Sequence, residues 1–374
     1  MPRSRAFSII ELLVVVMVIA IIVAILLPAL AGTRTATKRS DTESLCTQLS
    51  QAISRFQGDT KRLPGRFSVR DLAQAQNVTR GLSMGENIML DLSGAKVQDS
   101  APSAMTPDWV QVGPYNAVNT QVWVNVVESQ SQGAAYFGPP ARYYVAQAPG
   151  SQVGVAGHTA GAGSQLLDLV DSFGQPLLVW MEDPATPSAP LVSTTKGSGG
   201  RTAFAGDEFD PATIASGMSG PAKFYWSTNG AFLRSTAMGR MRTNQTSVDP
   251  ESGSLLAAQA QGEHVESLAA LLGNPAFPGY PPDAAGNPNL AAAATQIYPT
   301  AGRGTYVIHS AGADGLFMGR NVKSNKGATF TNAGILRYGA CIKDKAGGRY
   351  TDAGGQASTI DFAKEFDDVV VAGQ

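Results

Sequence analysis

Glu11 is the first residue of the chain whose chemistry needs an explanation, because it lies inside an apolar run. The run extends from Phe7 to Leu30 and is broken only by Ser8, Glu11 and Pro28. A helix of this length reaches roughly 36 Å, against a bilayer hydrocarbon core of about 30 Å, so the run is long enough to span a membrane. A carboxylate in that core costs on the order of 3 kcal/mol unless it is protonated or paired. The position of Glu11 therefore indicates a partner for its charge.

A cut between Ala6 and Phe7 would supply that partner, because Phe7 would then carry a new α-amino group. Glu11 becomes the fifth residue of the shortened chain, and in a staggered bundle the amine of an incoming subunit can pair with Glu11 of its neighbour. Two other interpretations stay open, a secretory signal peptide cut before Gly32 and a plain membrane anchor. Neither explains Glu11, and the apolar run is longer than the roughly 7 to 15 residues of a usual signal peptide core.

These residues resemble the class III signal of type IV pilins and of type II secretion pseudopilins. The similarity rests on the basic leader Arg3-Ser4-Arg5-Ala6, the Phe-x-x-x-Glu start at Phe7, the apolar run and Pro28. The family usually has Gly before the cut, where this chain has Ala6. The resemblance implies that a prepilin peptidase removes the leader, residues 1–6, and N-methylates Phe7. It also implies that Glu11 serves assembly into a filament of identical copies.

Two further stretches resemble the major pseudopilin. The segment Asp171-Ser-Phe-Gly-Gln-Pro176 is similar to its Asp-x-Trp-Gly-x-Pro turn, with Phe173 in the aromatic place. Asp suits the first position of a turn, and Gly suits a position with positive φ. The stretch from Thr305 to Gly315 is similar to the family's C-terminal strand and Ser-x-Gly-x-Asp-Gly turn, and residues 366–370 are similar to its closing segment.

In that family the C-terminal region binds calcium, so the resemblance implies a calcium ion held by Ser310, Asp314, Asp367 and Asp368. Calcium takes roughly six to eight oxygen ligands, which these side chains and turn carbonyls can help supply. The two pieces lie much farther apart here than in the family. The alternative is that Asp314-Gly315 is a hairpin turn and that the terminal acids are solvated.

Catalytic arrangements find little support. The histidines His158, His264 and His309 lie in no H-E-x-x-H or comparable metal spacing. Gly81-Leu-Ser83-Met-Gly85 has the letters of a nucleophile elbow, but the residues before it are polar and predict no buried strand. His309 and Ser310 are neighbours on an expected strand, so their side chains point to opposite faces. We therefore expect no enzyme.

One long helix is expected to carry Glu11, from Phe7 to about residue 57, with residues 7–30 in the membrane. Beyond Pro28 the pattern becomes amphipathic, with one apolar stripe that comprises Leu45, Leu49, Ile53 and Phe56. Pro28 is expected to kink the helix because proline removes a backbone donor. The amphipathic half should lie on an antiparallel β-sheet, which gives an α+β, pilin-like fold.

The head, residues 58–374, is expected to consist of short strands joined by Gly, Ser and Pro turns. Strands are predicted over 121–128, 142–146, 177–181, 223–227 and from Thr305, with the first two as neighbours. One helix is predicted from Asp249 to Leu272, ended by Gly273. The head is longer than that of a usual pseudopilin, and the excess is assigned to insertions at about 75–165 and 184–303.

Composition favours a folded, exported head. The chain has 374 residues, is 43% hydrophobic and 15% charged, and carries a formal net charge of -1. Such a balance offers no basic surface for nucleic acid. Cys46 and Cys341 are expected either to form a disulfide or to be buried thiols. Arg3 and Arg5 favour a cytoplasmic N-terminus, which places the head in the periplasm or outside the cell.

The resemblance as a whole implies a structural subunit of a type II secretion pseudopilus that pushes folded cargo across the outer membrane. The implied partners are the inner membrane, further copies of the chain, a prepilin peptidase, an assembly ATPase with its platform protein, and a secretin. Two alternatives stay open. The chain could be a type IV pilus subunit, or a membrane-tethered ligand-binding or catalytic domain that uses a pilin-type anchor.

Overall fold

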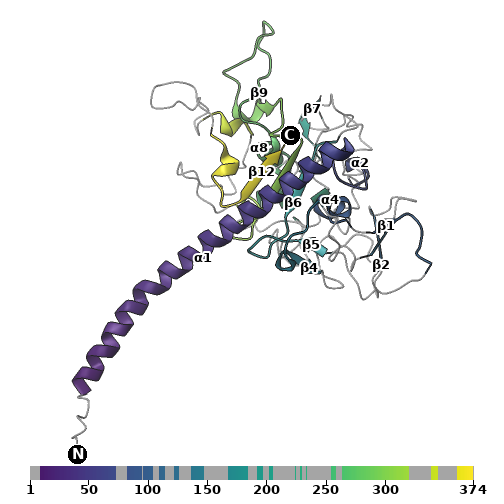
Figure 1. The fold of residues 1–374 in the computed structure, drawn as a ribbon. Helices are drawn as coiled ribbons and strands as arrows, with labels where there is room; N and C mark the ends of the chain where they lie inside the picture. Colours follow the sequence, from purple (N-terminus) through teal and green to yellow (C-terminus); the bar gives the residue numbers. More distant parts are fainter. Residues whose placement is uncertain are drawn as a thin grey trace, which may run out of the picture.

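The molecule consists of a long N-terminal helix and a head packed around the far half of that helix (Figure 1). The computed structural model describes residues 9–72, 82–94, 96–103, 109–113, 122–125, 136–146, 167–183, 192–196, 202–204, 224, 228–229, 233, 254–257, 263–319, 338–343 and 360–373. The strand pairs described in the head are antiparallel. This layout confirms the predicted α+β, pilin-like fold class.

Helix α1 (Ile9–Thr60) is continuous over 52 residues and curves gently along its length (Figure 1). It continues through position 28, where the sequence predicts a kink. The helix ends a few residues later than predicted. Lys61 has a φ of 60°, and its amide donates to the carbonyl of Gln57 at 2.9 Å. A residue with positive φ after the last turn is a common way to end a helix.

The second half of α1 packs on the head through the predicted apolar stripe. Leu45, Leu49, Ile53 and Phe56 are all buried, as the spacing predicts. A polar contact fixes the helix on the sheet below it. The hydroxyl of Tyr306 donates to the carbonyl of Ser50 at 3.0 Å and lies 2.8 Å from its Oγ.

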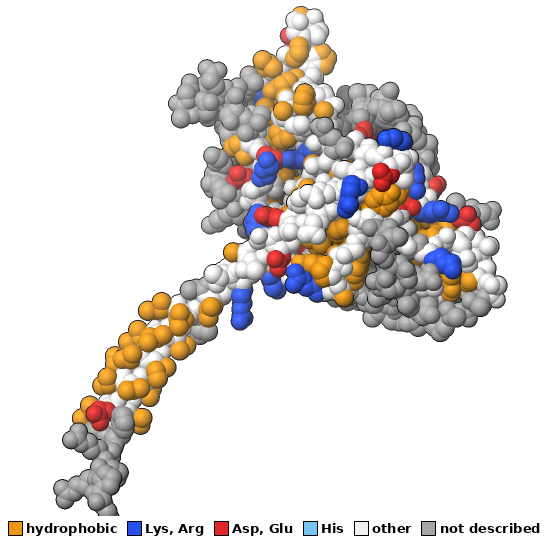
Figure 2. Space-filling view, in the orientation of Figure 1, with side chains coloured by type: hydrophobic (Ala, Val, Ile, Leu, Met, Phe, Trp, Pro, Cys, Tyr) orange, Lys and Arg blue, Asp and Glu red, His pale blue; other side chains and the backbone are white. Residues whose placement is uncertain are grey.

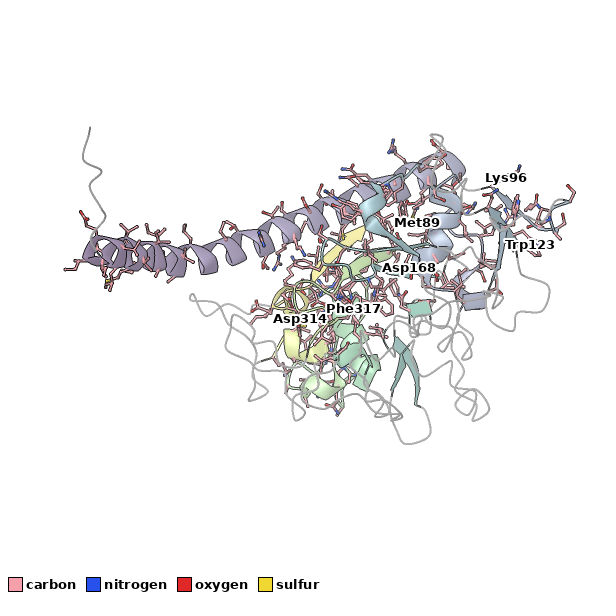
Figure 3. The ribbon with its side chains drawn as sticks, turned by 90° about the horizontal axis from the view of Figure 1, so that it is seen from below. Met89, Lys96, Trp123, Asp168, Asp314 and Phe317 are labelled. Carbon is pink, nitrogen blue, oxygen red and sulfur yellow. The ribbon has the colours of Figure 1, made fainter. Side chains whose placement is uncertain are left out.

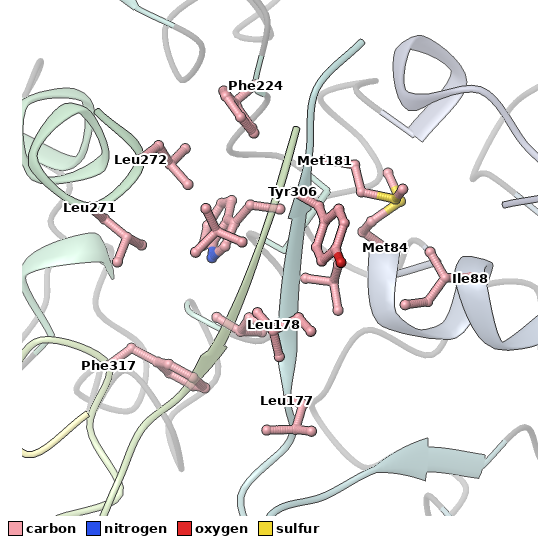
Figure 4. Close-up of a cluster of buried hydrophobic side chains, with 14 of the residues drawn as sticks. Met84, Ile88, Leu177, Leu178, Met181, Phe224, Leu271, Leu272, Tyr306 and Phe317 are labelled. Atoms are coloured by element: carbon pink, nitrogen blue, oxygen red, sulfur yellow. The ribbon is translucent and has the colours of Figure 1, made fainter. Parts of the chain in front are cut away.

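The central sheet has three antiparallel strands in the order β12-β11-β6. They are β6 (Leu178–Met181), β11 (Tyr306–Ser310) and β12 (Val369–Gly373), and Ile308 pairs with both Val371 and Val179. Every residue of β6 and β11 is buried, because elements cover both faces of the sheet. Figure 4 shows side chains of α8 on one side of these strands and side chains of α4 on the other. None of the three strands comes from the predicted insertions.

Helix α4 (Met84–Leu92) is absent from the prediction. Ser83 caps its first turn in a reciprocal arrangement, in which Ser83 Oγ accepts from the Glu86 amide at 3.1 Å and a Glu86 carboxylate oxygen accepts from the Ser83 amide at 2.7 Å. This is the capping box expected of a Ser-x-x-Glu sequence. Ser83 therefore caps a helix. Its hydroxyl accepts a backbone hydrogen bond there, whereas the serine of a nucleophile elbow lies on a turn between a strand and a helix.

The predicted pairing of two outer strands is wrong. The strand predicted over 121–128 is described as β3 (Val122–Asn125), and the one over 142–146 as β4 (Tyr144–Ala146). β4 pairs with β5 (Leu167–Leu169) instead of β3. Both edges of β3 are already occupied, one by β1 (Val97–Gln98) and the other by β2 (Trp109–Val112), so it has no free edge for β4.

The predicted helix of the second insertion is shorter than expected. Its described α-helical part is α8 (Glu263–Leu272), and it ends before Gly273 as predicted. Residues Leu255–Ala257 form the 3-10 turn η3 instead of the same helix. Ser254 Oγ accepts from the Leu256 amide at 3.1 Å and donates to the carbonyl of Phe317. Such side-chain bonds to the backbone compete with helix formation. The predicted strand over 223–227 falls almost wholly outside the described residues.

The remaining elements are short. They are the helix α2 (Val69–Leu72), the 3-10 turns η1 (Ala141–Tyr143), η4 (Ala294–Gln296), η5 (Tyr338–Cys341) and η6 (Phe362–Lys364), and the strands β7 (Val192–Lys196), β8 (Thr202–Phe204), β9 (Pro278–Gly279) and β10 (Tyr298–Pro299). β9 and β10 pair and form the base of a projection, residues 274–300, which we call the arm.

Candidate functional site

The N-terminal half of α1 is the first part of the candidate site. Its stretch from Ile9 to Leu26 is long and apolar enough to cross a membrane, and none of it is buried against the head. Figure 2 shows hydrophobic side chains covering this projecting half. Glu11 lies in its first turn and is exposed. The predicted cleavage residues, Ala6 and Phe7, lie outside the described residues.

The second part of the site is the turn before β6, which Asp171 organises. Its Oδ1 accepts from the amides of Phe173 at 2.8 Å and Gln175 at 2.9 Å, and Gly174 takes the positive φ of 86°. Its Oδ2 accepts from the hydroxyl of Ser310 at 2.6 Å. Burial raises the pKa of Asp171, and these hydrogen bonds oppose that rise. The two stretches that resemble the major pseudopilin are therefore joined by one buried hydrogen bond.

The side chain of His309 lies on the face of the sheet opposite to that of Ser310, as predicted for neighbouring residues of a strand. Its Nε2 bonds to Oδ2 of Asp368, which also accepts from the amide of Met318 at 2.8 Å. His309 and Asp368 are both buried, and the ring of Phe317 packs edge-on against the imidazole with centroids 5.1 Å apart. Burial raises the pKa of Asp368, and the bond from His309 opposes that rise. Asp368 thereby holds the segment before β12 against both β11 and the turn after β11.

Asp314, which is labelled in Figure 3, lies in the turn after β11 and contacts Asp367 of the segment before β12. The amide of Asp314 donates to Oδ2 of Asp367 at 2.9 Å, and Asp314 Oδ1 accepts from the amide of Leu316 at 2.7 Å. Gly312 has a φ of 69°, and a Cβ there would lie 2.4 Å from the carbonyl oxygen of Asp367. The turn therefore needs glycine at 312 to let the two segments approach.

The four predicted calcium ligands are thus brought into one region, although they come from segments far apart in the sequence. Ser310 and Asp368 are each committed to a side-chain partner, as described above. The Oδ1 atoms of Asp367 and Asp368 are buried without a hydrogen-bond partner. Among the described residues, no group of three or more His, Cys, Asp or Glu side chains is arranged to hold a metal ion. Calcium binding here stays a prediction.

A pair of buried acids, Glu86 and Asp168, is a feature that the sequence analysis misses. Their carboxyl groups are hydrogen-bonded to each other between α4 and β5, beside a cavity of about 10 Å³, which has room for about one water molecule. Burial raises the pKa of Glu86 to about 7 and raises that of Asp168 well above its ordinary value. The Ser-x-x-Glu spacing could have identified α4 and Glu86. No local pattern points to Asp168.

The two cysteines are free and buried. Burial, with the nearby carboxylates of Asp171 and Glu43, raises the pKa of the Cys46 thiol to about 12. A thiol in that state is a packing residue of the α1 stripe and a poor nucleophile. Of the two expected states of these cysteines, a disulfide or buried thiols, the structure shows buried thiols.

Comparison with known proteins locates a match at the N-terminus. Residues 1–27 match the prokaryotic N-terminal methylation motif, which is the prepilin-type motif. No curated protein and no solved structure matches the chain. The motif covers the leader and most of the apolar stretch that includes Glu11, and it indicates a type IV pilin-like or pseudopilin-like subunit with a single N-terminal membrane anchor. It also implies processing by a prepilin peptidase and assembly into a membrane-associated filament.

Proposed function

We propose that the chain is a structural subunit of a type II secretion pseudopilus, whose growth pushes folded cargo across the outer membrane. The observation that carries the proposal is the apolar half of α1, which packs on nothing in the described head. Burying an aliphatic side chain of this size is worth about 1.5–3 kcal/mol. A helix that exposes such side chains on all sides needs lipid before assembly and neighbouring helices after it.

Glu11 supplies the register of that assembly. It is exposed in the first turn of α1, at the end of the helix that is farthest from the head. After cleavage behind Ala6, the α-amino group of Phe7 in one copy pairs with Glu11 of the next. Pairing of the two charges lowers the cost of placing each of them in lipid. Assembly is thereby coupled to the cut.

The contact between the two pseudopilin-like turns supports a pseudopilus over a surface pilus. The turn at Asp171 and the strand that ends at Ser310 resemble the same family separately, and a 2.6 Å hydrogen bond joins them. In this proposal the head lies in the periplasm, the anchor in the inner membrane and the N-terminus in the cytoplasm. An assembly ATPase, its platform protein and a secretin are the partners.

The surroundings of Ser83 and His309, the two residues considered as candidates for catalysis, are consistent with a mechanical role. Ser83 is buried as a helix cap, and His309 is buried against Asp368 and Phe317. Neither side chain presents its reactive atom to solvent. A catalytic domain on a pilin-type anchor would need such an atom within reach of a substrate.

Cysteine crosslinking of full-length protein in membranes tests the proposal. Single cysteines at exposed α1 positions such as Val16 and Val23 should give ladders of copies on oxidation, and the buried Cys46 and Cys341 can stay in place. Glu11→Ala should lower the ladders about tenfold or more, since leaving the Phe7 amine unpaired in lipid costs more than about 1.4 kcal/mol. Glu11→Gln should be intermediate.

Glu43→Gln is the matched control, because Glu43 is an exposed acid on the same helix outside the apolar half. It should leave the ladders unchanged. Undiminished ladders in Glu11→Ala would remove the assembly role from Glu11. Absence of ladders in the unaltered chain would overturn the filament itself.

A further inference from the structure

The arm, residues 274–300, carries the exposed large hydrophobic side chains of the described head. Outside the apolar half of α1, the large hydrophobic residues that are exposed within the described ranges are Phe277 at 54% and Leu290 at 49%. Both lie on the arm, which appears with its hydrophobic surface at the top of Figure 2. Single exposed hydrophobic residues are ordinary. Two on one projecting element favour a contact surface there.

The arm is a built element with its own hydrogen bonds. At its tip the amide of Asp283 donates to the carbonyl of Asn287 at 2.7 Å, and Gly286 takes a φ of 86°. Farther down, the amide of Asn289 donates to the carbonyl of Pro281 at 2.9 Å. Prolines recur along it, at positions 275, 278, 281, 282, 288 and 299. A chain stiffened in this way loses little conformational entropy when it docks.

The base of the arm is anchored in the head. Tyr338 of η5 donates its hydroxyl proton to the carbonyl of Asn274 at 2.6 Å, and Lys343 Nζ donates to the carbonyl of Leu290 at 3.0 Å. The arm itself has a single charged residue, Asp283. Its partner surface is therefore apolar or neutral, because charged groups would be desolvated there without compensation.

The position of the arm restricts what can cover it. Figure 1 shows the arm projecting from the head at the opposite end of the molecule from the N-terminus. The bilayer that holds the N-terminal half of α1 is therefore out of its reach. The prepilin-type motif implies assembly into a membrane-associated filament, so further copies of the chain are partners that the arm can reach.

We propose that the arm is a contact between heads, in which Phe277 and Leu290 pack on the head of the copy that lies next farther from the membrane. This inference rests on the proposed filament function. An arm that meets a different surface of its neighbour makes a heterologous contact, and such contacts propagate into open helical assemblies. The low charge of the arm also avoids repulsion between identical subunits. Helix packing through α1 and arm packing through the heads would thus be two separate contacts.

Site-specific photo-crosslinking of the full-length chain tests this contact. A benzophenone amino acid at position 277 should give an adduct between two copies, identified by co-expressing copies with two different tags. The same probe at Ala284, which is exposed on the same arm, tests whether the tip or the flank makes the contact. α1 cysteine ladders are recorded in the same membranes, so that assembly is measured independently of the arm.

Phe277→Ser combined with Leu290→Ser should lower filament recovery about tenfold while α1 crosslinks between neighbouring pairs persist. Ala284→Ser with Ala291→Ser is the matched control at exposed positions of the arm and should change nothing. α1 ladders without a copy-to-copy adduct from position 277, or an adduct only with another protein or with lipid, would overturn the arm contact and leave the proposed function standing. Loss of both signals would overturn both.

Discussion

The buried pair of Glu86 and Asp168 predicts an unusual pH dependence of stability. Burial raises the pKa of Glu86 from 4.5 to about 7, and it raises that of Asp168 as well. None of the other residues that line the adjoining cavity titrates in this range. They are Leu49, Ser83, Gly85, Ile88, Leu169, Pro176, Leu177 and Val179. The proton is therefore held by the two acids themselves.

The sign of the effect follows from proton counting. Above about pH 4.5 the unfolded chain releases the Glu86 proton, whereas the folded chain keeps it until about pH 7. The folded state binds more protons in this window, so the free energy of unfolding falls as pH rises and levels off above it. The pKa of Glu86 rises from 4.5 to about 7 on folding. At about 1.4 kcal/mol for each pKa unit, Glu86 therefore lowers the free energy of unfolding by roughly 3 kcal/mol across this pH range.

Glu86→Gln removes this loss with little change of shape. The amide oxygen can still accept from the Ser83 amide, and the amide nitrogen can donate to Asp168. We expect the variant to be more stable than the unaltered chain at pH 8, by up to roughly 3 kcal/mol, and nearly equal to it at pH 5. Glu43→Gln, at an exposed ion pair of α1, should change stability by less than about 0.5 kcal/mol at either pH.

Urea unfolding of the full-length protein in a nonionic detergent, followed by tryptophan fluorescence between pH 4.5 and 8, measures these differences. The reasoning would be refuted by an unfolding midpoint that is constant over this range. It would be refuted equally by a Glu86→Gln variant that loses stability with pH as steeply as the unaltered chain.

Three further predictions concern the N-terminus, the predicted calcium site and the contact between Ser310 and Asp171. Mass spectrometry of purified mature protein should find an N-methylated Phe7 as the first residue, and a chain that begins at Gly32 would exclude helix-mediated assembly. Millimolar calcium should raise the melting temperature of the detergent-solubilised protein, by the equivalent of about 2.7 kcal/mol at a hundredfold excess over Kd. Asp314→Ala should abolish this increase. Identical melting curves with calcium and with chelator would show that no such site exists. Ser310→Ala should lower the free energy of unfolding in urea by about 1–3 kcal/mol, because it removes the hydroxyl that donates to Oδ2 of the buried Asp171 at 2.6 Å. A loss below about 0.5 kcal/mol would mean that water replaces the hydroxyl.

Local patterns predicted the elements whose burial follows a simple period. The stripe from Leu45 to Phe56 repeats at helical spacing, and all of its predicted members are buried. The turn at Asp171 was visible because its geometry depends on residues within a few positions of one another. The C-terminal strand starting at Thr305 was visible for the same reason, as an apolar run with a Gly turn behind it.

Pairings between distant segments could not be predicted in this way. β4 reads as a strand, but its sequence holds no information about which of β3 and β5 has a free edge. Helix α4 is not predicted, because the letters of its capping box overlap those of a nucleophile elbow and the residues around it have no long helical period. Helix propensity over so short a stretch is a weak signal, and tertiary packing decides it.

The buried acids show why this limit matters for function. In the sequence, Glu86 and Asp168 are ordinary polar residues of a helix and a strand, and polar residues at such positions are expected to face water. They are buried because α4 is laid across β5 by contacts with the central sheet, whose strands β6, β11 and β12 come from three distant parts of the chain. The raised pKa of each acid is a consequence of that placement, since burial is the largest cause of both shifts. The pH dependence of the head is therefore a property of its topology, and substitutions that loosen the packing of α4 on β5 should reduce it even when both acids are retained.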